Sequence, residues 1–360
     1  DRRGNSLCIR YSCYLNSVLS ASAAIVASMK MAASFSPCQP IFVTCERGSL
    51  PRGGECRSRV SATNSGVGRN PDDYNATVEA LKSKGRRPRK ALGQHYMLNM
   101  DVNKQLSRAA NVEEGDVVLE IGPGTGSLTN VLINDGAAVL AIEKDPHMAA
   151  IVNERFTKTG RFKVVQEDFV RCNIQNHLQS LQQAICSSGG ISRKAKVVAN
   201  IPFNISTEVI KQLLPMGCIF SQVALLVQDE TALRLVDSSP GSSEYRSINV
   251  FVNFYSEPEY RFHVPKSFFF PQPSVDAAVM TFKIKQAEEY PAVSSAKSFF
   301  SMVNSAFNGK RKMLRRSLQH LCSSGEIEEA LSDLGLPVTS RPEELTLDDF
   351  VNLHNAIVKS

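Results

Sequence analysis

The sequence lacks three features that would place it in a common class. Its 360 residues contain no apolar run close to the ~20 residues of a membrane-spanning helix, so we expect a soluble protein with no membrane partner. Its nine cysteines form no CxxC pair, so we expect no bound metal. A disulfide framework is not expected in a chain of this size, and the thiols are interpreted as reduced and buried or incidental.

The body of the chain also lacks an excess of positive charge. The whole sequence carries 41 basic and 35 acidic residues, a formal net charge of +6. Residues 1–70 hold nine of the basic and three of the acidic residues, so 32 of each remain in residues 71–360. Because the body is neutral by count, only local basic clusters can indicate contact with a nucleic acid.

The N-terminal segment 1–75 is interpreted as a targeting segment, because it is rich in Ser, Ala and Arg and poor in acids. The string Met31-Ala-Ala-Ser-Phe-Ser-Pro resembles the start of a plastid transit peptide, and translation from Met29 or Met31 would leave residues 1–28 or 1–30 upstream. A mitochondrial presequence and a disordered tail without an address are the alternatives. We expect a protein of the chloroplast stroma, with the mitochondrion as the alternative location.

Apolar β-branched runs alternate with helical segments from about residue 91 to residue 285. The predicted strands are 116–121, 138–142, 162–165, 196–199, 223–227, 250–254 and 279–284. The predicted helices are 127–134, 146–156 (with Pro146 in the first turn) and 206–214 (with Ser206 as its cap). This alternation predicts an α/β fold with a parallel sheet covered by helices on both faces. Short helices at 298–307, 312–320, 327–334 and 347–358 predict a small helical C-terminal domain.

A glycine-rich loop, Gly122-Pro123-Gly124-Thr125-Gly126, follows the first of these strands and opens a helix. Glycines at Gly122 and Gly124 let the backbone turn sharply and approach a ligand, although such a loop alone would also suit NAD or FAD. Glu143, at the end of the next strand, is placed to accept both hydroxyls of a ribose. Asp168, at the end of the third strand, is placed to accept from an adenine amino group. Together these residues predict a cradle for an adenosine-containing cofactor.

The heptapeptide Asn200-Ile201-Pro202-Phe203-Asn204-Ile205-Ser206 ends the fourth strand. It resembles the (Asn/Asp/Ser)-Pro-Pro-(Tyr/Phe) motif of methyltransferases that act on exocyclic amino groups. The Asn200 side-chain oxygen and the Ile201 carbonyl can each accept one amino hydrogen, and Pro202 rigidifies the turn. Phe203 offers a face on which a flipped base stacks, worth roughly 1–3 kcal/mol. No strong general base is required, because the nitrogen becomes acidic once it is methylated.

Two basic clusters are predicted to contact RNA phosphates, with a solvated surface as the alternative for each. The first lies within residues 79–90, directly before the first motif, and the second lies near the C-terminus. The predicted RNA-binding residues are Arg86, Arg87, Lys90, Lys310, Arg311, Lys312 and Arg315.

From about residue 86 to 345 the sequence resembles the KsgA/Dim family of ribosomal RNA adenine dimethyltransferases. The segment 90–98, KALGQHYML, resembles the family's KxxGQxFL. The glycine loop, the strand-end acids and NIPFNIS follow in the family's order. Residues 264–279 resemble its PxxFxPxPxVxS segment, and residues 306–318 resemble its FxxRRKxLxNxL segment.

The resemblance implies a Rossmann-like class I methyltransferase domain at 76–285 and a C-terminal RNA-contacting domain at 286–360. It implies that S-adenosylmethionine is the cofactor, and that a monomer dimethylates two adjacent adenosines near the 3′ end of small-subunit rRNA within an immature ribosomal particle. The implied cofactor-binding residues are His95, Met97, Gly122, Gly124, Glu143, Asp168 and Asn200. The predicted catalytic residues are Asn200, Ile201, Pro202 and Phe203.

The sequence departs from the family at His95, where bacterial members usually have Asn, and at Met97, where they have Leu. Phe203 replaces the commoner Tyr, which keeps the stacking face and removes a hydroxyl. Gly309-Lys310 replaces the first Arg of the C-terminal motif. Three alternatives stay open: a methyltransferase-derived RNA- or DNA-binding assembly or transcription factor, a resistance methylase of large-subunit rRNA, and an NAD enzyme.

Overall fold

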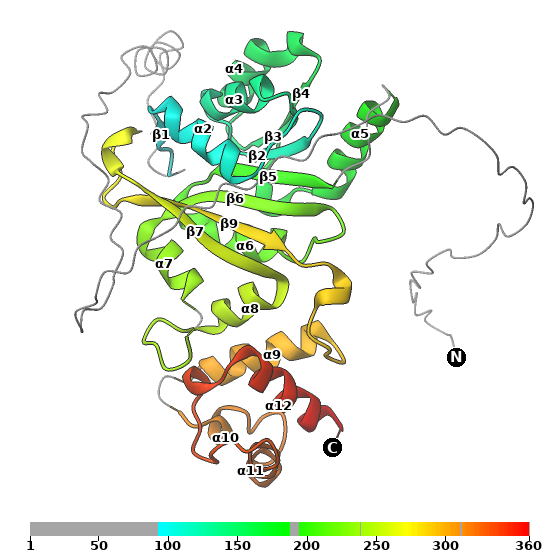
Figure 1. Cartoon of the computed structure of the whole chain (residues 1–360), viewed down its shortest axis with the longest axis vertical. Helices are drawn as coiled ribbons and strands as arrows, with labels where there is room; N and C mark the ends of the chain where they lie inside the picture. The colour runs from blue at the N-terminus through cyan, green and yellow to red at the C-terminus, as the bar shows by residue number, and fades with distance from the viewer. Residues whose placement is uncertain (1–92, 188–193, 238, 310–311, 360) are drawn as a thin grey trace, which may run out of the picture. The chain divides into compact units, whose positions relative to one another are not determined.

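The computed structural model describes residues 93–187, 194–237, 239–309 and 312–359 (Figure 1). The predicted targeting segment 1–75 and the basic run 79–90 lie outside the described residues. Among the described helices, none combines the length and the apolar character that a bilayer crossing requires.

A seven-stranded sheet forms the centre of the described fold. Its strands are β2 (Val117–Ile121), β3 (Ala138–Glu143), β4 (Phe162–Gln166), β5 (Ala195–Asn200), β6 (Phe220–Gln228), β7 (Ser256–Val264) and β9 (Ala277–Ile284). They lie in the order β4-β3-β2-β5-β6-β9-β7. The first five strands are parallel, whereas β9 pairs antiparallel with both β6 and β7. The predicted α/β class with a mostly parallel sheet is confirmed.

Helices cover both faces of this sheet (Figure 1). Their bounds are α2 (Met100–Ala109), α3 (Ser127–Asn134), α4 (Pro146–Phe156), α5 (Ile174–Ser187), α6 (Ser206–Leu213), α7 (Asp229–Val236) and α8 (Ser247–Tyr255). Because alternate strand residues point to opposite faces, Val118 packs in one core cluster with α2, α3 and α4. Its neighbour Leu119 packs in the other cluster, with α5, α6, α7 and α8.

The start of α4 follows its prediction, and the start of α6 does not. Pro146 is the first residue of α4, and the Asp145 side chain caps the helix by accepting from the His147 amide. Ser206 is the first residue of α6 and not its cap, since its hydroxyl donates to the Phe203 carbonyl at 3.0 Å. The predicted capping role of Ser206 is therefore wrong.

The strand predicted at 250–254 is also wrong, because these residues lie within helix α8. A short apolar run has no periodicity that separates a buried strand from a buried helix. At the start of α8, the Asn249 side-chain oxygen accepts from the Arg246 amide at 3.0 Å, and the Asn249 amide donates to the Arg246 carbonyl at 2.9 Å. The adjacent residues that do form a strand, β7, were not predicted as one.

The C-terminal helices are α9 (Ala296–Phe307), α10 (Leu314–Ser317), α11 (Ser324–Asp333) and α12 (Leu347–Lys359). The helix predicted at 312–320 is shorter than expected, because the chain leaves α10 at Leu318 and Ser323 then caps α11. The aromatic rings of Phe254 and Phe299 join α8 to α9, with centroids 5.3 Å apart. These helices share the core cluster of one sheet face. The domain boundary at 285 stays a prediction.

A two-stranded ribbon places the segment from residue 93 onward against the sheet. Strand β1 (Tyr96–Met97) pairs antiparallel with β8 (Phe269–Phe270). The Leu98 amide also donates to the Phe268 carbonyl at 2.8 Å. A strand of only two residues gives no local sequence signal. The position of β1 therefore depends on its pairing with the distant 263–276 segment.

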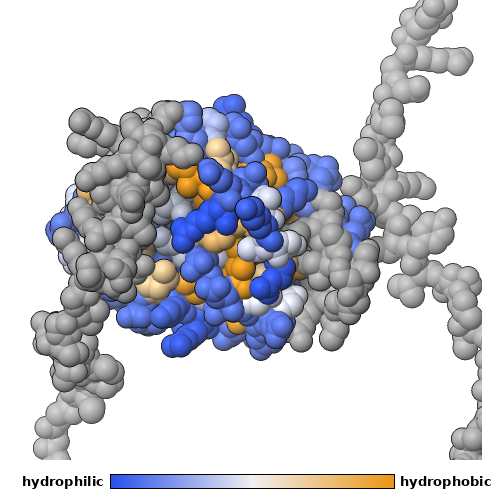
Figure 2. Space-filling model, turned by 90° about the horizontal axis from the view of Figure 1, so that it is seen from above, coloured by the Kyte–Doolittle hydropathy of each residue, from blue (hydrophilic) through white to orange (hydrophobic). Residues whose placement is uncertain are grey.

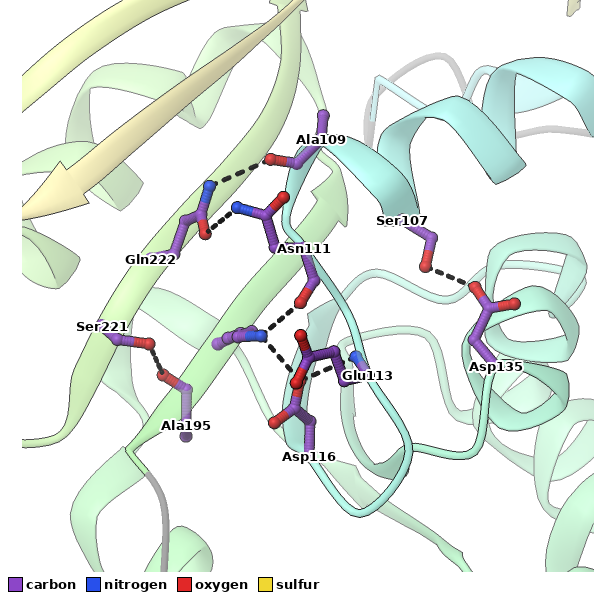
Figure 3. A network of polar contacts seen from close by, with 10 residues as sticks. Ser107, Ala109, Asn111, Glu113, Asp116, Asp135, Ala195, Ser221 and Gln222 are labelled. Atoms are coloured by element: carbon purple, nitrogen blue, oxygen red, sulfur yellow. Dashed lines mark hydrogen bonds and ion pairs between the residues drawn. The ribbon is translucent and has the colours of Figure 1, made fainter. Parts of the chain in front are cut away.

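A polar network ties α2 to the amino ends of β2 and β5 (Figure 3). The carboxylate of Asp116, directly before β2, lies 2.7 Å from the ammonium of Lys196 on β5. The same ammonium donates to the Asn111 carbonyl. Gln222 on β6 donates to the Ala109 carbonyl at 2.9 Å and accepts from the Asn111 side chain. This end of the sheet is closed by polar groups that satisfy one another.

On the face seen from above, hydrophilic and hydrophobic residues are interspersed at the surface. Figure 2 shows hydrophobic residues there in several small areas separated by hydrophilic ones. Such scattered apolar exposure is normal for a water-exposed surface.

Candidate active site

A cavity opens at the carboxyl ends of β2, β3, β4 and β5, the edge at which open α/β sheets bind ligands. Every residue predicted from the sequence to bind the cofactor or to take part in catalysis lines this cavity. These residues are His95, Met97, Gly122, Gly124, Glu143, Asp168, Asn200, Ile201, Pro202 and Phe203. The structure therefore brings both predicted sites into one place, while their individual roles stay predictions.

The glycine loop after β2 needs its glycines. Gly122, Gly124 and Gly126 have φ values of 68°, 56° and 84°, in the left-handed region that other residues rarely adopt. A Cβ on Gly124 would lie 3.0 Å from the Tyr96 ring. A Cβ on Gly122 would meet nothing within 4 Å, so this side of the loop leaves open space.

Two buried carboxylates lie beside this loop. Glu120, on β2, accepts from the Thr129 hydroxyl at 2.6 Å, and burial raises its pKa to about 8. Glu143, at the end of β3, accepts from the amides of Asp145 at 2.8 Å and Gly124 at 3.3 Å. Burial also raises the pKa of Glu143. No described lysine or arginine forms a salt bridge with either carboxylate, so negative charge here has no cationic partner within the described chain.

Asp168 has a cationic partner. Its carboxylate lies 2.9 Å from the Lys144 ammonium and also accepts from the Val170 amide at 3.2 Å. The hydrogen bond from Lys144 is the main reason that the pKa of Asp168 lies below its usual range. The Asp168 side chain is 30% exposed, so it borders the open part of the cavity.

The Asn200–Phe203 loop follows β5. The Asn200 side chain donates through Nδ2 to the His95 carbonyl at 3.4 Å, which leaves its oxygen Oδ1 as the acceptor. Ile201 is buried, and Pro202 leads into a 3₁₀ turn, η4 (Phe203–Ile205). The prediction required Asn200 and Phe203 to face the cofactor cleft, and both residues line the cavity.

The segment from residue 93 crosses over this loop. The His95 and Phe203 rings are stacked, with centroids 6.1 Å apart and an interplanar angle of 23°. The Nδ1 atom of His95 lies 2.7 Å from the Pro271 carbonyl oxygen. The Met97 side chain, in contrast, packs in the core cluster with α2, so a cofactor contact would come mainly from its backbone.

Of the predicted RNA-binding residues, only Lys312 and Arg315 lie in the described part of the chain, and neither lines the cavity. Arg86, Arg87, Lys90, Lys310 and Arg311 lie outside the described residues. Lys312 is exposed at the start of the C-terminal cluster. Arg315 is half-buried, and it forms an ion pair of 2.7 Å with Glu328 on α11. Arg315 thus joins α10 to α11, and its contact with RNA stays a prediction.

Sequence reasoning missed three groups at the site: the Lys144 ammonium, the Tyr96 ring and the Pro271 carbonyl. Lys144 directly follows Glu143 at a strand end, so its position was a usable signal. Pro271 is 176 residues from His95, and nothing local in the sequence indicates that contact.

The fold and this site define a class I methyltransferase. A dimethyladenosine transferase from Plasmodium falciparum superposes with a TM-score of 0.58 at 22% identity, over 71% of this chain and 95% of that chain. The 23S rRNA methyltransferase ErmE superposes with a TM-score of 0.54 at 20% identity, over 73% of this chain and 99% of that chain. At these identities the likeness concerns the fold.

Sequence comparison gives the family. Residues 85–359 match the family described as ribosomal RNA adenine dimethylase. The chloroplastic ribosomal RNA small subunit methyltransferase of Arabidopsis thaliana is 66% identical over 289 residues, covering 80% of this chain and 84% of its own. Ribosomal RNA small subunit methyltransferase A of Protochlamydia amoebophila is 35% identical over 273 residues, covering 76% of this chain and 92% of its own. This chain belongs to the ribosomal RNA adenine dimethylase family.

Proposed function

We propose that this chain dimethylates the exocyclic amino groups of two adjacent adenosines near the 3′ end of small-subunit rRNA in the chloroplast stroma. Family membership makes the chain an rRNA adenine dimethyltransferase of ribosome biogenesis. The observation that supports the proposed site best is that the Asn200 loop and the glycine loop line one cavity. The chloroplast location rests on the likeness to the chloroplastic Arabidopsis protein.

The cavity fits S-adenosylmethionine, which when bound supplies a methyl group from a positively charged sulfur. Gly122 leaves open space where a side chain would otherwise stand, so a ligand can approach the backbone. Glu120 and Glu143 place two buried carboxylates next to that space. A cationic ligand would favour their charged forms, which burial alone disfavours.

The strand-end acids would hold the adenosine part. Glu143 accepts the two ribose hydroxyls, because its carboxylate is already oriented by the Asp145 and Gly124 amides. Asp168 accepts from the adenine amino group, and Lys144 keeps the Asp168 carboxylate charged for that role.

The catalytic loop would hold the target amino group. Asn200 Oδ1 and the Ile201 carbonyl each accept one amino hydrogen, which fixes the nitrogen and directs its lone pair out of the ring plane. Phe203 stacks on the base, which must be unpaired or flipped to enter. The methylated nitrogen is acidic enough to release its proton to water.

We infer that the substrate is a partly assembled small subunit and that the chain acts as a monomer. Lys312 is exposed, and with Lys310 and Arg311 it would contact phosphates and orient the RNA. An assembly or transcription factor without essential catalysis is the alternative, and the family names do not favour it.

Methyl transfer to immature small subunits tests this proposal. We expect label from methyl-labelled S-adenosylmethionine in two adjacent adenosines near the rRNA 3′ end, mapped as N6,N6-dimethyladenosine by mass spectrometry. Binding of the particle without any label in adenine would indicate the non-catalytic alternative. Label in large-subunit rRNA would indicate the resistance-methylase alternative.

A further inference from the structure

We propose that Glu167, Cys172 and His177, which follow β4, bind a borderline-soft divalent cation such as Zn²⁺. Ligand atoms of the three side chains all lie within 4.8 Å of one another. The sequence predicted no metal because it has no CxxC pair, whereas these three residues stand at intervals of five. The inference does not depend on the proposed function, since no step of that function uses any of the three.

The spacing of the ligand atoms is close to that of a tetrahedral metal site. His177 Nε2 lies 3.4 Å from a Glu167 carboxylate oxygen. Ordinary Zn–N and Zn–O bonds place two tetrahedral ligands about 3.4 Å apart, and a Zn–S bond lengthens this spacing to about 3.6 Å. The Cys172 Sγ atom lies within 4.8 Å of both other ligand atoms, so it has to move by roughly 1 Å at most.

The fold holds each of the three residues in place. The Glu167 amide donates to the Glu143 carbonyl at 3.1 Å, which ties Glu167 to the end of β3. Cys172 packs in the core cluster that also contains residues of α5. His177 lies on α5 three residues after the buried Ile174, and therefore on the same side of the helix. Ligands that are fixed in advance lose less entropy when a cation binds.

The three side chains suit Zn²⁺ in kind and in charge. Thiolate, imidazole and carboxylate are its usual protein ligands, and three of them leave a fourth position for water. One thiolate and one carboxylate balance the two positive charges of the ion. Within the described part of the chain, no lysine or arginine forms an ion pair with Glu167. Mg²⁺ and Ca²⁺ prefer oxygen ligands and suit this set poorly.

A reactive or redox-active thiol is the alternative use of Cys172. Burial, and then the hydrogen bond to Glu167, raise the pKa of the Cys172 thiol to about 12. A thiol that keeps its proton is a poor nucleophile and oxidises slowly. A bound dication opposes both causes, because it neutralises the Glu167 carboxylate and the buried thiolate together. Binding would therefore release the thiol proton.

The site is open to solvent and lies beside the cofactor cavity. The Glu167 side chain is 42% exposed and that of His177 is 26% exposed, so a cation can reach them from solution. Glu167 also lines the cavity and directly precedes Asp168. A bound cation would join the end of β4 to the start of α5 and so stabilise the folded chain.

Cobalt substitution tests the site in the full chain, because Co²⁺ bound to a thiolate gives a near-ultraviolet charge-transfer band. Serine first replaces the cysteines of the N-terminal segment, so that their thiols cannot give the band: Cys8, Cys13, Cys38, Cys45 and Cys56. We expect one equivalent of Co²⁺ to produce the band and one equivalent of Zn²⁺ to bleach it, since Zn²⁺ binds such ligands more tightly. Excess Mg²⁺ should leave it unchanged. No band, or a band that Mg²⁺ bleaches, would overturn the assignment.

Substitutions assign the band to particular residues. Cys172→Ser and Cys172→Ala should abolish it, and His177→Gln and Glu167→Gln should each weaken Co²⁺ binding at least about 10-fold. The matched controls are Cys218→Ser, at an exposed free cysteine, and His147→Gln, at an exposed histidine on α4. Both controls should bind Co²⁺ as the parent chain does. A band that survives both Cys172 substitutions would mean that the ion binds elsewhere, and the assignment would be wrong.

Thermal unfolding gives a second readout that needs no absorption band. Zn²⁺ at about 100 times its dissociation constant should raise the unfolding temperature of the parent chain by about 5 °C. Cys172→Ala should show no such rise. Because each chain is compared with itself without Zn²⁺, any loss of stability in the variant does not affect the result. An equal rise in Cys172→Ala would contradict the site. Neither readout uses methyl transfer, so failure of the metal site and failure of the proposed function are distinguishable.

Discussion

Two buried carboxylates, Asp116 and Glu120, lie at opposite ends of strand β2, and each is only 1% exposed. At the amino edge of the sheet, the Lys196 ammonium neutralises Asp116 at 2.7 Å (Figure 3). At the carboxyl edge, Glu120 receives a neutral hydroxyl from Thr129, and burial raises its pKa to about 8. One edge thus satisfies its charge internally, whereas the other holds a carboxyl group that burial favours in its neutral form, beside a cavity that we propose for a cationic cofactor.

The largest expected effect concerns the amino edge. Lys196→Met leaves the buried Asp116 carboxylate without its cation, so we expect the free energy of unfolding to fall by about 3 kcal/mol. Urea unfolding measures this change, and the dissociation constant of S-adenosylhomocysteine should not change. Lys163→Met, on the exposed side of β4, is the control and should have almost no effect. Equal stability of the two variants would contradict the assigned role of the ion pair.

The next effect concerns Glu120 and has a definite sign with pH. Because its folded pKa is raised from 4.5 to about 8, the native state retains a proton that the unfolded chain releases. This contribution to stability is present below about pH 4.5 and is lost as the pH rises to about 8. Glu120→Gln keeps a partner for Thr129 and should gain a few kcal/mol over the wild type at pH 8, with little difference at pH 4.5.

Urea unfolding across pH 4.5–8 measures that difference. The control is Glu257→Gln, which changes an exposed glutamate on β7. Its free energy of unfolding should change with pH in the same way as that of the wild type. If the free energies of unfolding of the wild type and of Glu120→Gln changed with pH in parallel, the pKa of Glu120 would not be raised in the folded state.

A smaller effect is expected at the glycine loop. Gly124→Ala places a Cβ 3.0 Å from the Tyr96 ring at a φ of 56°, which costs about 1–2 kcal/mol in backbone strain alone. Because Gly124 lines the cavity and its Cβ would press on the Tyr96 ring, the loop must shift at the site. We expect the dissociation constant of S-adenosylhomocysteine to rise about 10-fold, which corresponds to about 1.4 kcal/mol. Gly160→Ala has a similar φ of 68° and open space, so it should lose stability with unchanged affinity. Unchanged affinity in Gly124→Ala would remove this loop from the cofactor site.

The smallest effect is again at the amino edge. Ser107 is buried and donates to Asp135 at 2.6 Å, so Ser107→Ala should lower the free energy of unfolding by about 1 kcal/mol. Thermal unfolding measures it, and methyl transfer at a temperature where the variant is folded should be normal. Reduced transfer with normal stability would mean that the two edges are coupled.

The parts of the site that the sequence predicted are those carried by strand ends. Glu143, Asp168 and Asn200 each follow or end a parallel strand, and the carboxyl ends of parallel strands meet at one edge. Local sequence therefore sufficed to place them together. The glycine loop was also predictable from local sequence, because its positive φ values require glycine.

The rest depends on pairing between distant segments or on an ambiguous pattern. The position of His95 against Phe203 follows from the β1–β8 ribbon and the contact with Pro271, neither of which has a local signal. Helix α8 was mistaken for a strand, because an apolar run of that length has no periodicity that separates a buried strand from a buried helix. The roles of the basic residues at 86–90 and 310–312 stay predictions.

Methyl transfer by Asn200→Ala probes the proposed catalytic loop, because the Asn200 oxygen is proposed to accept from the amino group of the target adenine. We predict that single-turnover transfer to immature small subunits falls at least about 100-fold, the effect of losing one preorganised hydrogen-bonding group, while the dissociation constant of S-adenosylhomocysteine changes less than about 3-fold. Asn153→Ala, an exposed asparagine on α4, should transfer normally. Transfer by Asn200→Ala at the wild-type rate would show that Asn200 does not hold the target amino group.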